Sequence, residues 1–344
     1  RPVHNMMTKV PRQMNRNQRR ALAESTVEII ESGLLPTTDT TCTGGLCSTF
    51  DISEQIQASV QGTCSYPPGS YVPPPLQVQG LKEKEQQEKN KREAATETIT
   101  SYTLVNTTTL QAAKALVQRI DPTRKVAVLN FASAKNPGGG FLKGSMAQEE
   151  SLALNTGLYA CIRNDKMYTF HRGTTKKGGK QFTRRGQTQQ QDVGTYSDWT
   201  IFSPDVPVFR NEDDGSILGV DDHFVISVLT CPCINKKRTT KSGEELQHLL
   251  KKRMLRMLTV LAAHHDGNVV LGAWGCGVFG NDPFDIAKLF AGILRREEFL
   301  NRWPRVVFAV LDQQHDSPTI SAFQRGGICG EIDRENAFIN STEQ

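Results

Sequence analysis

The sequence predicts a three-layer α/β/α domain with a mixed, mostly parallel central sheet and a helical extension at the N-terminus. Two observations support this fold class. Short apolar runs rich in β-branched residues recur along the second two-thirds of the chain, and segments with helical periodicity lie between them. Strands that alternate with helices are typical of parallel sheets covered on both faces. The expected strands are residues 126–131, 224–229, 269–271 and 306–311.

The N-terminal third has a different character. Residues 15–32 form an expected helix, with Leu22, Val27, Ile29 and Ile30 on its apolar side and Gly33 as a stop signal. The Pro-, Thr- and Ser-rich segment that follows is expected to be loop, with a short helix at residues 52–60 and a solvated helix or linker at residues 82–93. We therefore divide the chain into an extension packed on the core (1–97), an α/β domain (98–330) and a tail (331–344).

Helices of the α/β domain are expected between its strands. Ligands of such domains bind at the carboxyl ends of the strands, near helix N-termini. The loops that follow the strands are therefore the places to search for a site. The expected helices are residues 109–118, 148–161, 244–264 and 283–295.

Composition narrows the class of protein. The chain has 344 residues, 37% of them hydrophobic, a net charge of +5 and eight cysteines, none in a C-x-x-C pair. These values favour a globular protein of a reducing, intracellular compartment. No run of 18 apolar residues exists, so no membrane span is expected. His264-His265-Asp266 is not expected to bind metal, because adjacent helix positions face different ways.

Basic residues are concentrated in residues 1–20 and 163–185. The first segment holds six Lys and Arg without an acid, and the second holds eight against Asp165 alone. Such runs are usually solvated surface, yet they also attract polyanions over long range. Both interpretations stay open at this point.

The first functional motif is a glycine turn followed by two carboxylates. The strand ending at Phe131 leads to Gly138-Gly139-Gly140, and Gln148-Glu149-Glu150 begins a helix after seven further residues. Glycines let backbone N–H groups approach a ligand closely. Taken alone, the glutamates would complement the helix dipole, a contribution of about 0.3–1 kcal/mol each. The glycine triplet beside them favours a ligand site instead.

A second glycine loop, residues 271–282, lies between a strand and a helix that starts near Pro283. A strand, a glycine-rich turn and a helix N-terminus together form an anion site. We therefore expect this loop to bind an anion.

The spacing of the first motif resembles the signature of poly(ADP-ribose) glycohydrolases. Residues 129–141 resemble the bacterial-type branch, which also occurs in filamentous fungi, and further stretches agree over roughly residues 16–323. The resemblance implies a macrodomain-like fold and makes residues 98–330 the catalytic domain. The further stretches are residues 20–23, 196–199, 203–210 and 271–282.

The resemblance also implies roles. Glu150 is the catalytic acid and Glu149 holds ribose hydroxyls. The loop from Gly275 to Phe279, Cys276 included, wraps the diphosphate, and Phe279 orders the terminal ribose. Because neighbouring helix residues point about 100° apart, the two glutamates do not flank one bond, and a single acid carries the chemistry. Cys276 is read as structural within its loop. The other expected substrate-binding residues are Asn136, Gly138, Gly139, Gly140, Gln148, Gly275, Gly277 and Val278.

The expected function is hydrolysis of the ribose–ribose bonds of poly(ADP-ribose). The expected partners are the polymer, ADP-ribose and poly-ADP-ribosylated proteins. No cofactor or metal is expected, the protein is expected to be a monomer, and the resemblance implies an intracellular place in the DNA damage response. Two alternatives remain: a macrodomain that binds ADP-ribose without catalysis, and a mono-ADP-ribosyl hydrolase.

Overall fold

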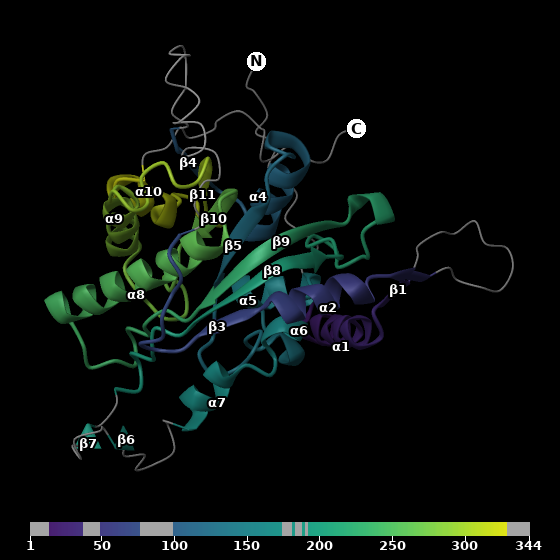
Figure 1. Ribbon diagram of the computed structural model, residues 1–344, viewed down its shortest axis with the longest axis horizontal. Coiled ribbons are helices and arrows are strands. Elements are labelled where there is room, and N and C mark those ends of the chain that lie inside the picture. The colour runs from purple at the N-terminus through teal and green to yellow at the C-terminus, as the bar shows by residue number, and fades with distance from the viewer. Residues whose placement is uncertain are drawn as a thin grey trace, which may run out of the picture.

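The computed structural model describes residues 14–36, 49–75, 99–173, 181–182, 188–189 and 192–328. A seven-stranded sheet runs through the molecule in the order β3-β8-β9-β5-β10-β11-β4 (Figure 1). The five strands from β9 to β4 pair in parallel, whereas β8 and β3 join antiparallel at one edge. The expected mixed, mostly parallel sheet is confirmed. The strands, in sheet order, are β3 (Cys64–Tyr66), β8 (Thr200–Val208), β9 (Phe224–Cys231), β5 (Val126–Phe131), β10 (Asn268–Gly272), β11 (Arg305–Ala309) and β4 (Ser101–Val105).

Both faces of the sheet are buried. In β5, Ala127 and Leu129 belong to the hydrophobic cluster on one face, and Val126 and Val128 belong to the cluster on the other. Side chains alternate between faces along a strand, so a continuous apolar run indicates a sheet covered on both sides. This is why the strand runs of the sequence show no polar alternation.

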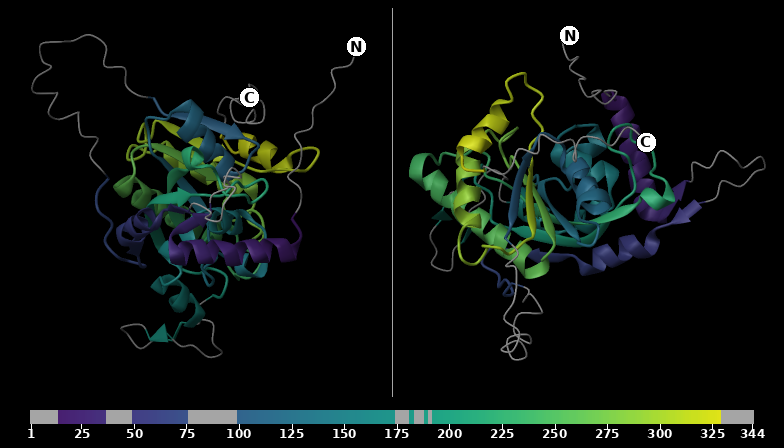
Figure 2. Two further views of the ribbon diagram at one scale, coloured as in Figure 1. Left: turned by 90° about the vertical axis from the view of Figure 1, so that its right-hand side faces the viewer. Right: turned by 90° about the horizontal axis from the view of Figure 1, so that it is seen from above.

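Helices form the two outer layers (Figure 2). The first cluster contains side chains of three C-terminal helices, and the second contains side chains of four helices from the middle of the chain. The three-layer expectation is therefore confirmed. The first layer is α8 (Gly243–His264), α9 (Pro283–Leu294) and α10 (Pro318–Arg325); the second is α4 (Thr109–Ala115), α5 (Gln148–Asn155), α6 (Leu158–Ile162) and α7 (Lys166–Gly173).

The N-terminal extension packs beside the second helical layer. Its main helix, α1 (Arg16–Ser32), starts with a capping box between Asn15 and Gln18 and ends at Gly33, as the sequence predicts. The extension also supplies β3, so the first 97 residues contribute an edge strand to the main sheet. Its other elements are β1 (Leu34–Pro36), β2 (Thr49–Asp51) and α2 (Ser53–Gly62).

The buried side chain of Arg210 joins α1 to the domain through hydrogen bonds. Arg210, just after β8, is 4% exposed and donates hydrogen bonds to Thr26 Oγ1 (3.0 Å), Ser25 Oγ (2.8 Å) and Gly215 O (3.0 Å). All three acceptors are neutral. Burial lowers the pKa of the Arg210 guanidinium to about 10. Two of the three hydrogen bonds of this side chain therefore depend on α1 being in place.

Several expected boundaries differ from the structure. The single helix expected at 148–161 is two helices, because Thr156 bridges to Val208 and Gly157 N–H donates to Pro207 O at 2.9 Å. α4 continues as a π-helical turn at Leu116–Ile120. Strand β8 was not expected, because Pro204 and Pro207 argue against a strand; a register shift accommodates the first of them. Short 3₁₀ turns occur at Phe141–Lys143 and Val220–Asp222.

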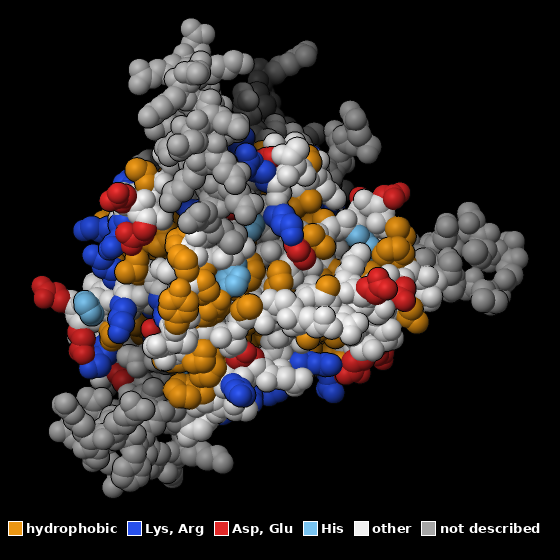
Figure 3. Space-filling view, in the orientation of Figure 1, with side chains coloured by type: hydrophobic (Ala, Val, Ile, Leu, Met, Phe, Trp, Pro, Cys, Tyr) orange, Lys and Arg blue, Asp and Glu red, His pale blue; other side chains and the backbone are white. Residues whose placement is uncertain are grey.

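Some expectations lie outside the described residues. They are the helix or linker at 82–93, the tail at 331–344, and residues 1–13, 174–180 and 183–185 of the two basic segments. The small antiparallel sheet of β6 (Gln181–Phe182) and β7 (Thr188–Gln189) is described. On the face shown in Figure 3, acidic and basic side chains are interspersed around apolar ones. In the described part of the chain, no helix combines the length and apolar character that crossing a bilayer requires.

Candidate active site

The two glycine loops leave the sheet side by side. β5 and β10 are parallel neighbours, so the loops at their carboxyl ends emerge at the same edge. Gly272, the last residue of β10, packs against Phe131, the last residue of β5. A Cβ added to Gly272 would stand 2.9 Å from Phe131 Cζ. The fold thus joins two motifs that are more than 130 residues apart in the sequence.

The first loop turns on left-handed glycines. Gly138 and Gly139 have φ of 67° and 64°, and Gly139 N–H donates to Asn136 O at 3.0 Å. A Cβ on Gly139 would overlap Glu150 Oε1 and stand 2.9 Å from Glu149 Oε2. The turn therefore excludes side chains for two reasons, backbone conformation and the two carboxylates packed against it.

Glu150 lies in the first turn of α5 and faces this loop. Its Oε1 accepts a hydrogen bond from Gly140 N–H at 2.8 Å, and the residue is half-buried. One carboxylate oxygen is thereby held in place while the side chain stays accessible from outside. A general acid needs both properties, a defined position and access to the substrate.

Glu149, the residue before Glu150 in α5, is buried, with an exposed fraction of 4%. Its Oε2 accepts from Ser133 N–H at 2.7 Å, and its Oε1 is buried without a hydrogen-bond partner among the described residues. Burial raises the pKa of the Glu149 carboxyl well above its usual value; the hydrogen bond from Ser133 N–H opposes the rise, and the Glu150 charge adds to it.

Gln148 and Asn136 take different places. Gln148 Oε1 accepts from Phe131 N–H at 2.9 Å, and its Nε2 donates to Leu129 O at 2.7 Å and to Thr109 Oγ1 at 3.1 Å. This amide ties the start of α5 to β5 and so positions the two glutamates. Asn136 is exposed at the outer end of the loop. A substrate contact of either side chain stays a prediction.

The second loop is held by the side chain of Asn281, and part of its backbone is available to a ligand. Asn281 Nδ2 donates to Gly275 O at 3.0 Å and to Ile234 O at 2.7 Å, while Gly275 adopts a φ of 76°. The N–H groups of residues 277–279 donate to no acceptor within the described ranges. Three amides in a glycine-rich turn ahead of α9 are donors that an anion can accept.

Cys276 lies inside this loop. Its thiol donates to Trp274 O at 3.8 Å. Burial, and to a smaller extent the charge of Asp282, raises the pKa of the Cys276 thiol to about 12. The thiolate is the nucleophilic form of cysteine, so Cys276 offers no nucleophile at neutral pH.

Tyr196 lies between the two loops; it belongs to a stretch that resembles the family, but the sequence assigns it no role. Lys135 Nζ of the first loop lies 5.9 Å from the centre of its ring, and the ring of Phe279 in the second loop lies 6.0 Å away. Tyr196 has a φ of 52°, a conformation that non-glycine residues adopt only when surrounding contacts enforce it.

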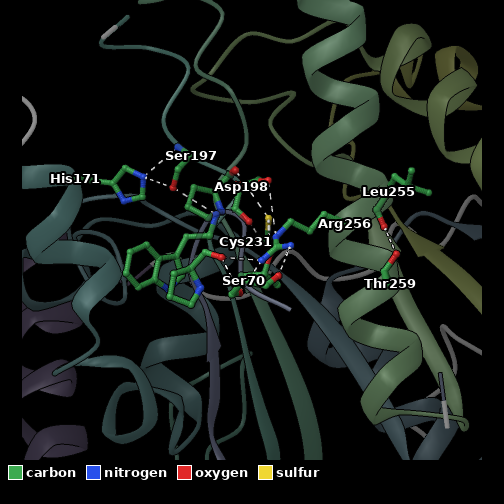
Figure 4. A network of polar contacts seen from close by, with 12 residues as sticks. Ser70, His171, Ser197, Asp198, Cys231, Leu255, Arg256 and Thr259 are labelled. Carbon is green, nitrogen blue, oxygen red and sulfur yellow. Dashed lines mark hydrogen bonds and ion pairs between the residues drawn. The ribbon is translucent and has the colours of Figure 1, made fainter. Parts of the chain in front are cut away.

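Buried polar contacts enforce that conformation (Figure 4). His171 Nε2 lies 2.9 Å from Ser197 Oγ and accepts from Ser197 N–H at 3.1 Å. Asp198 pairs with Arg256 at 3.8 Å, and Arg253 donates to Thr195 O at 2.6 Å. Burial lowers the pKa of His171 to about 4, so its ring is neutral at neutral pH and can accept from Ser197.

No set of three or more His, Cys, Asp or Glu side chains placed to hold a metal ion occurs in the described residues. The groups that the site brings together are therefore backbone amides, two carboxyls, an amine and two aromatic rings. They can grip an anion and present one acid to a bond beside it.

The chain matches known proteins over most of its length. Residues 23–211 match the model of the microbial-type PARG catalytic domain. Poly(ADP-ribose) glycohydrolase from Thermomonospora curvata, also solved with the inhibitor ADP-HPD, is 35% identical with a TM-score of 0.69, covering 90% of this chain and 99% of its own. The Deinococcus radiodurans enzyme in complex with ADP-ribose is 32% identical with a TM-score of 0.58, covering 79% of this chain and 96% of its own. A comparison with curated protein sequences gave no match.

These matches confirm the family that the two glycine loops and the Gln148-Glu149-Glu150 motif indicated, and they confirm the macrodomain-like fold expected from it. The chain belongs to the microbial-type poly(ADP-ribose) glycohydrolases.

Proposed function

We propose that this chain hydrolyses the ribose–ribose O-glycosidic bonds of poly(ADP-ribose) and releases ADP-ribose, with Glu150 as the general acid and base. One observation carries the proposal: Gly140 N–H fixes Glu150 beside two loops whose amides can hold a diphosphate. The solved relatives support it, since their structures hold ADP-ribose or the inhibitor ADP-HPD.

The reaction proceeds in two steps. Glu150 donates its proton to the leaving ribose oxygen as the bond from the anomeric carbon to that oxygen breaks, and the bonding electrons stay on the oxygen. The terminal ribose becomes an oxocarbenium ion. Water then attacks the anomeric carbon while the Glu150 carboxylate takes the proton of that water, which restores the acid.

Glu149 is proposed to bind the terminal ribose. Its buried Oε1 has no hydrogen-bond partner among the described residues, and a ribose hydroxyl can donate to it. The second loop holds the diphosphate through the amides of residues 277–279, and Phe279, braced by Tyr196, packs beside the ribose. Substrate position and acid position are thus set by separate elements.

Three further properties belong to the proposal. The protein acts as a monomer on poly-ADP-ribosylated proteins and inside the cell, in the nucleus or cytoplasm if its source is eukaryotic. The free thiols of the described cysteines suit a reducing compartment; they are Cys64, Cys161, Cys231, Cys233 and Cys276.

The decisive experiment compares Glu150→Gln with wild type on radiolabelled polymer and on mono-ADP-ribosylated protein. We expect kcat on polymer to fall about 10²–10⁴-fold, the usual worth of a general acid, with the Kd for ADP-ribose within threefold. Glu24→Gln, on the exposed side of α1, is the control and should retain wild-type activity.

Each alternative has its own outcome. Wild-type protein that binds ADP-ribose yet releases none from polymer would be a non-catalytic macrodomain. Turnover of mono-ADP-ribosylated protein alone would indicate a mono-ADP-ribosyl hydrolase. Full activity of the Glu150→Gln variant would reject the assignment of the acid.

A further inference from the structure

Basic side chains surround the outer rim of the two glycine loops. Lys135 follows β5, and Lys237 and Arg238 follow β9. The two strands are parallel neighbours, with Phe131 paired to Cys231, so all three cations emerge at the sheet edge that carries the site. We call these three residues the basic rim.

Two members of the basic rim, Lys237 and Lys135, lie directly at the loops. The side chain of Lys237 lies over Gly280, where an added Cβ would stand 2.8 Å from Lys237 Cε. Lys135 belongs to the first loop and lies against Tyr196. Burial, and then the charge of Arg238, lowers the pKa of Lys135, so the two cations are close enough to repel each other.

No carboxylate neutralises this rim within the described part of the chain. None of its three members forms an ion pair there. Thr239 and Thr240, which follow Arg238, bind the carboxylate of Asp192, whose oxygens accept from both threonine hydroxyls, from Thr240 N–H and from Gly194 N–H. Uncompensated like charges at the mouth of a site favour an anion there.

The terminal diphosphate has other ligands. In the proposed function it is held by the neutral amides of residues 277–279, inside the loop. Lys237 and Arg238 are exposed on long, flexible side chains, which suits phosphates that pass outside the loop rather than one fixed within it. Poly(ADP-ribose) has such phosphates in every unit beyond the terminal one, and mono-ADP-ribosylated protein has none.

We propose that the basic rim of Lys135, Lys237 and Arg238 is a second binding site, which takes diphosphate groups of the polymer beyond the terminal ADP-ribose. The inference rests on the proposed function. It gives the enzyme a preference for chains over single ADP-ribose groups, because only a chain reaches both sites at once. Binding at two linked sites raises affinity without any new contact at the first.

The test compares Lys237→Gln/Arg238→Gln with Lys251→Gln/Lys252→Gln, a charge-matched pair exposed on α8. We measure KM for long polymer between 50 mM and 300 mM salt and the Kd for free ADP-ribose. The rim variant should raise KM about tenfold at low salt and leave the Kd for ADP-ribose within twofold. The slope of log KM against log salt should flatten by about 1.4, or 0.7 for each lost phosphate contact of a single strand.

Two outcomes would overturn the proposal. Equal loss of polymer and ADP-ribose affinity would place these cations on the terminal diphosphate. A KM and salt slope equal to those of the control pair would show that only the overall charge matters. Failure of the proposed function is distinguishable, because it would appear as full activity of Glu150→Gln or as no release of ADP-ribose by the wild-type protein, whatever the rim variants do.

Discussion

Glu149 and Glu150 contact the same glycine turn through different backbone amides. Glu149 Oε2 accepts from Ser133 N–H at 2.7 Å, before the turn, and Glu150 Oε1 accepts from Gly140 N–H at 2.8 Å, at its end. Gly139 lies against both carboxylates. Neighbouring residues of one helix are thus separated into a buried carboxyl and an accessible one, and the turn between them fixes the position of each.

Gly139→Ala should abolish activity while the protein stays folded. The new Cβ overlaps Glu150 Oε1, and the left-handed backbone costs alanine about 1–2 kcal/mol. A displaced acid reduces kcat about 10²-fold or more, since a shift of one ångström has that effect. Kinetics on polymer measure the loss of activity, and thermal unfolding shows whether the protein stays folded.

The control for that change is Gly292→Ala in α9, where an added Cβ meets nothing within 4 Å. This variant should keep wild-type kinetics, and its free energy of unfolding should rise by about 0.5–1 kcal/mol, because alanine is the better helix former. Wild-type turnover by Gly139→Ala would show that the turn does not position Glu150.

Glu149→Gln should stabilise the protein increasingly as pH rises. The folded-state pKa of Glu149 lies above the unfolded one, so the wild-type protein loses up to about 1.4 kcal/mol per pH unit as pH rises from about 4.5 towards the raised value. Glutamine has no charge to bury and escapes this loss. Urea unfolding at pH 4.5, 6 and 7.5 measures the free energy of unfolding of both proteins. A difference between variant and wild type that stays constant across that range would contradict the raised pKa.

His171 should make the protein sensitive to acid. Its folded-state pKa of about 4 lies below the unfolded value of 6.5, so the unfolded chain takes up a proton first and stability falls as pH drops from 6.5 to 4. His171→Gln should flatten this part of the stability curve, whereas His315→Gln, at an exposed position, should leave it unchanged. Identical slopes in the two variants would count against a buried neutral His171.

The Tyr196 ring should matter for binding more than its hydroxyl does. Tyr196→Ala removes the ring between Lys135 and Phe279 and should weaken ADP-ribose binding about 2- to 13-fold, corresponding to the 0.5–1.5 kcal/mol of an aromatic contact. Tyr196→Phe keeps the ring and should bind within twofold of wild type. Calorimetry with ADP-ribose separates them; equal loss in both variants would assign the effect to the hydroxyl.

Much of the fold could be predicted because local signals agree with tertiary structure. β5 and β10 are mostly apolar because both of their faces are buried, and glycine loops follow them where the chain must turn. The site motif was visible because Gly138–Gly140 and Glu149–Glu150 are near in sequence. β8 was not predicted, because its prolines are tolerated only near the edge of the sheet, which the sequence does not show. Tyr196 was missed for a related reason: its neighbours Lys135 and Phe279 are distant in sequence.

Arg210 sets a lower limit on how far the protein can be shortened. Two of its three hydrogen-bond acceptors, Ser25 and Thr26, come from α1. A fragment that begins at the α/β domain would keep the Arg210 guanidinium but lose two of its three hydrogen-bond acceptors. A buried cation without partners costs several kcal/mol, which is a large part of a typical domain's free energy of unfolding. The first helix is therefore an inseparable part of the catalytic unit, and a minimal active fragment has to include it.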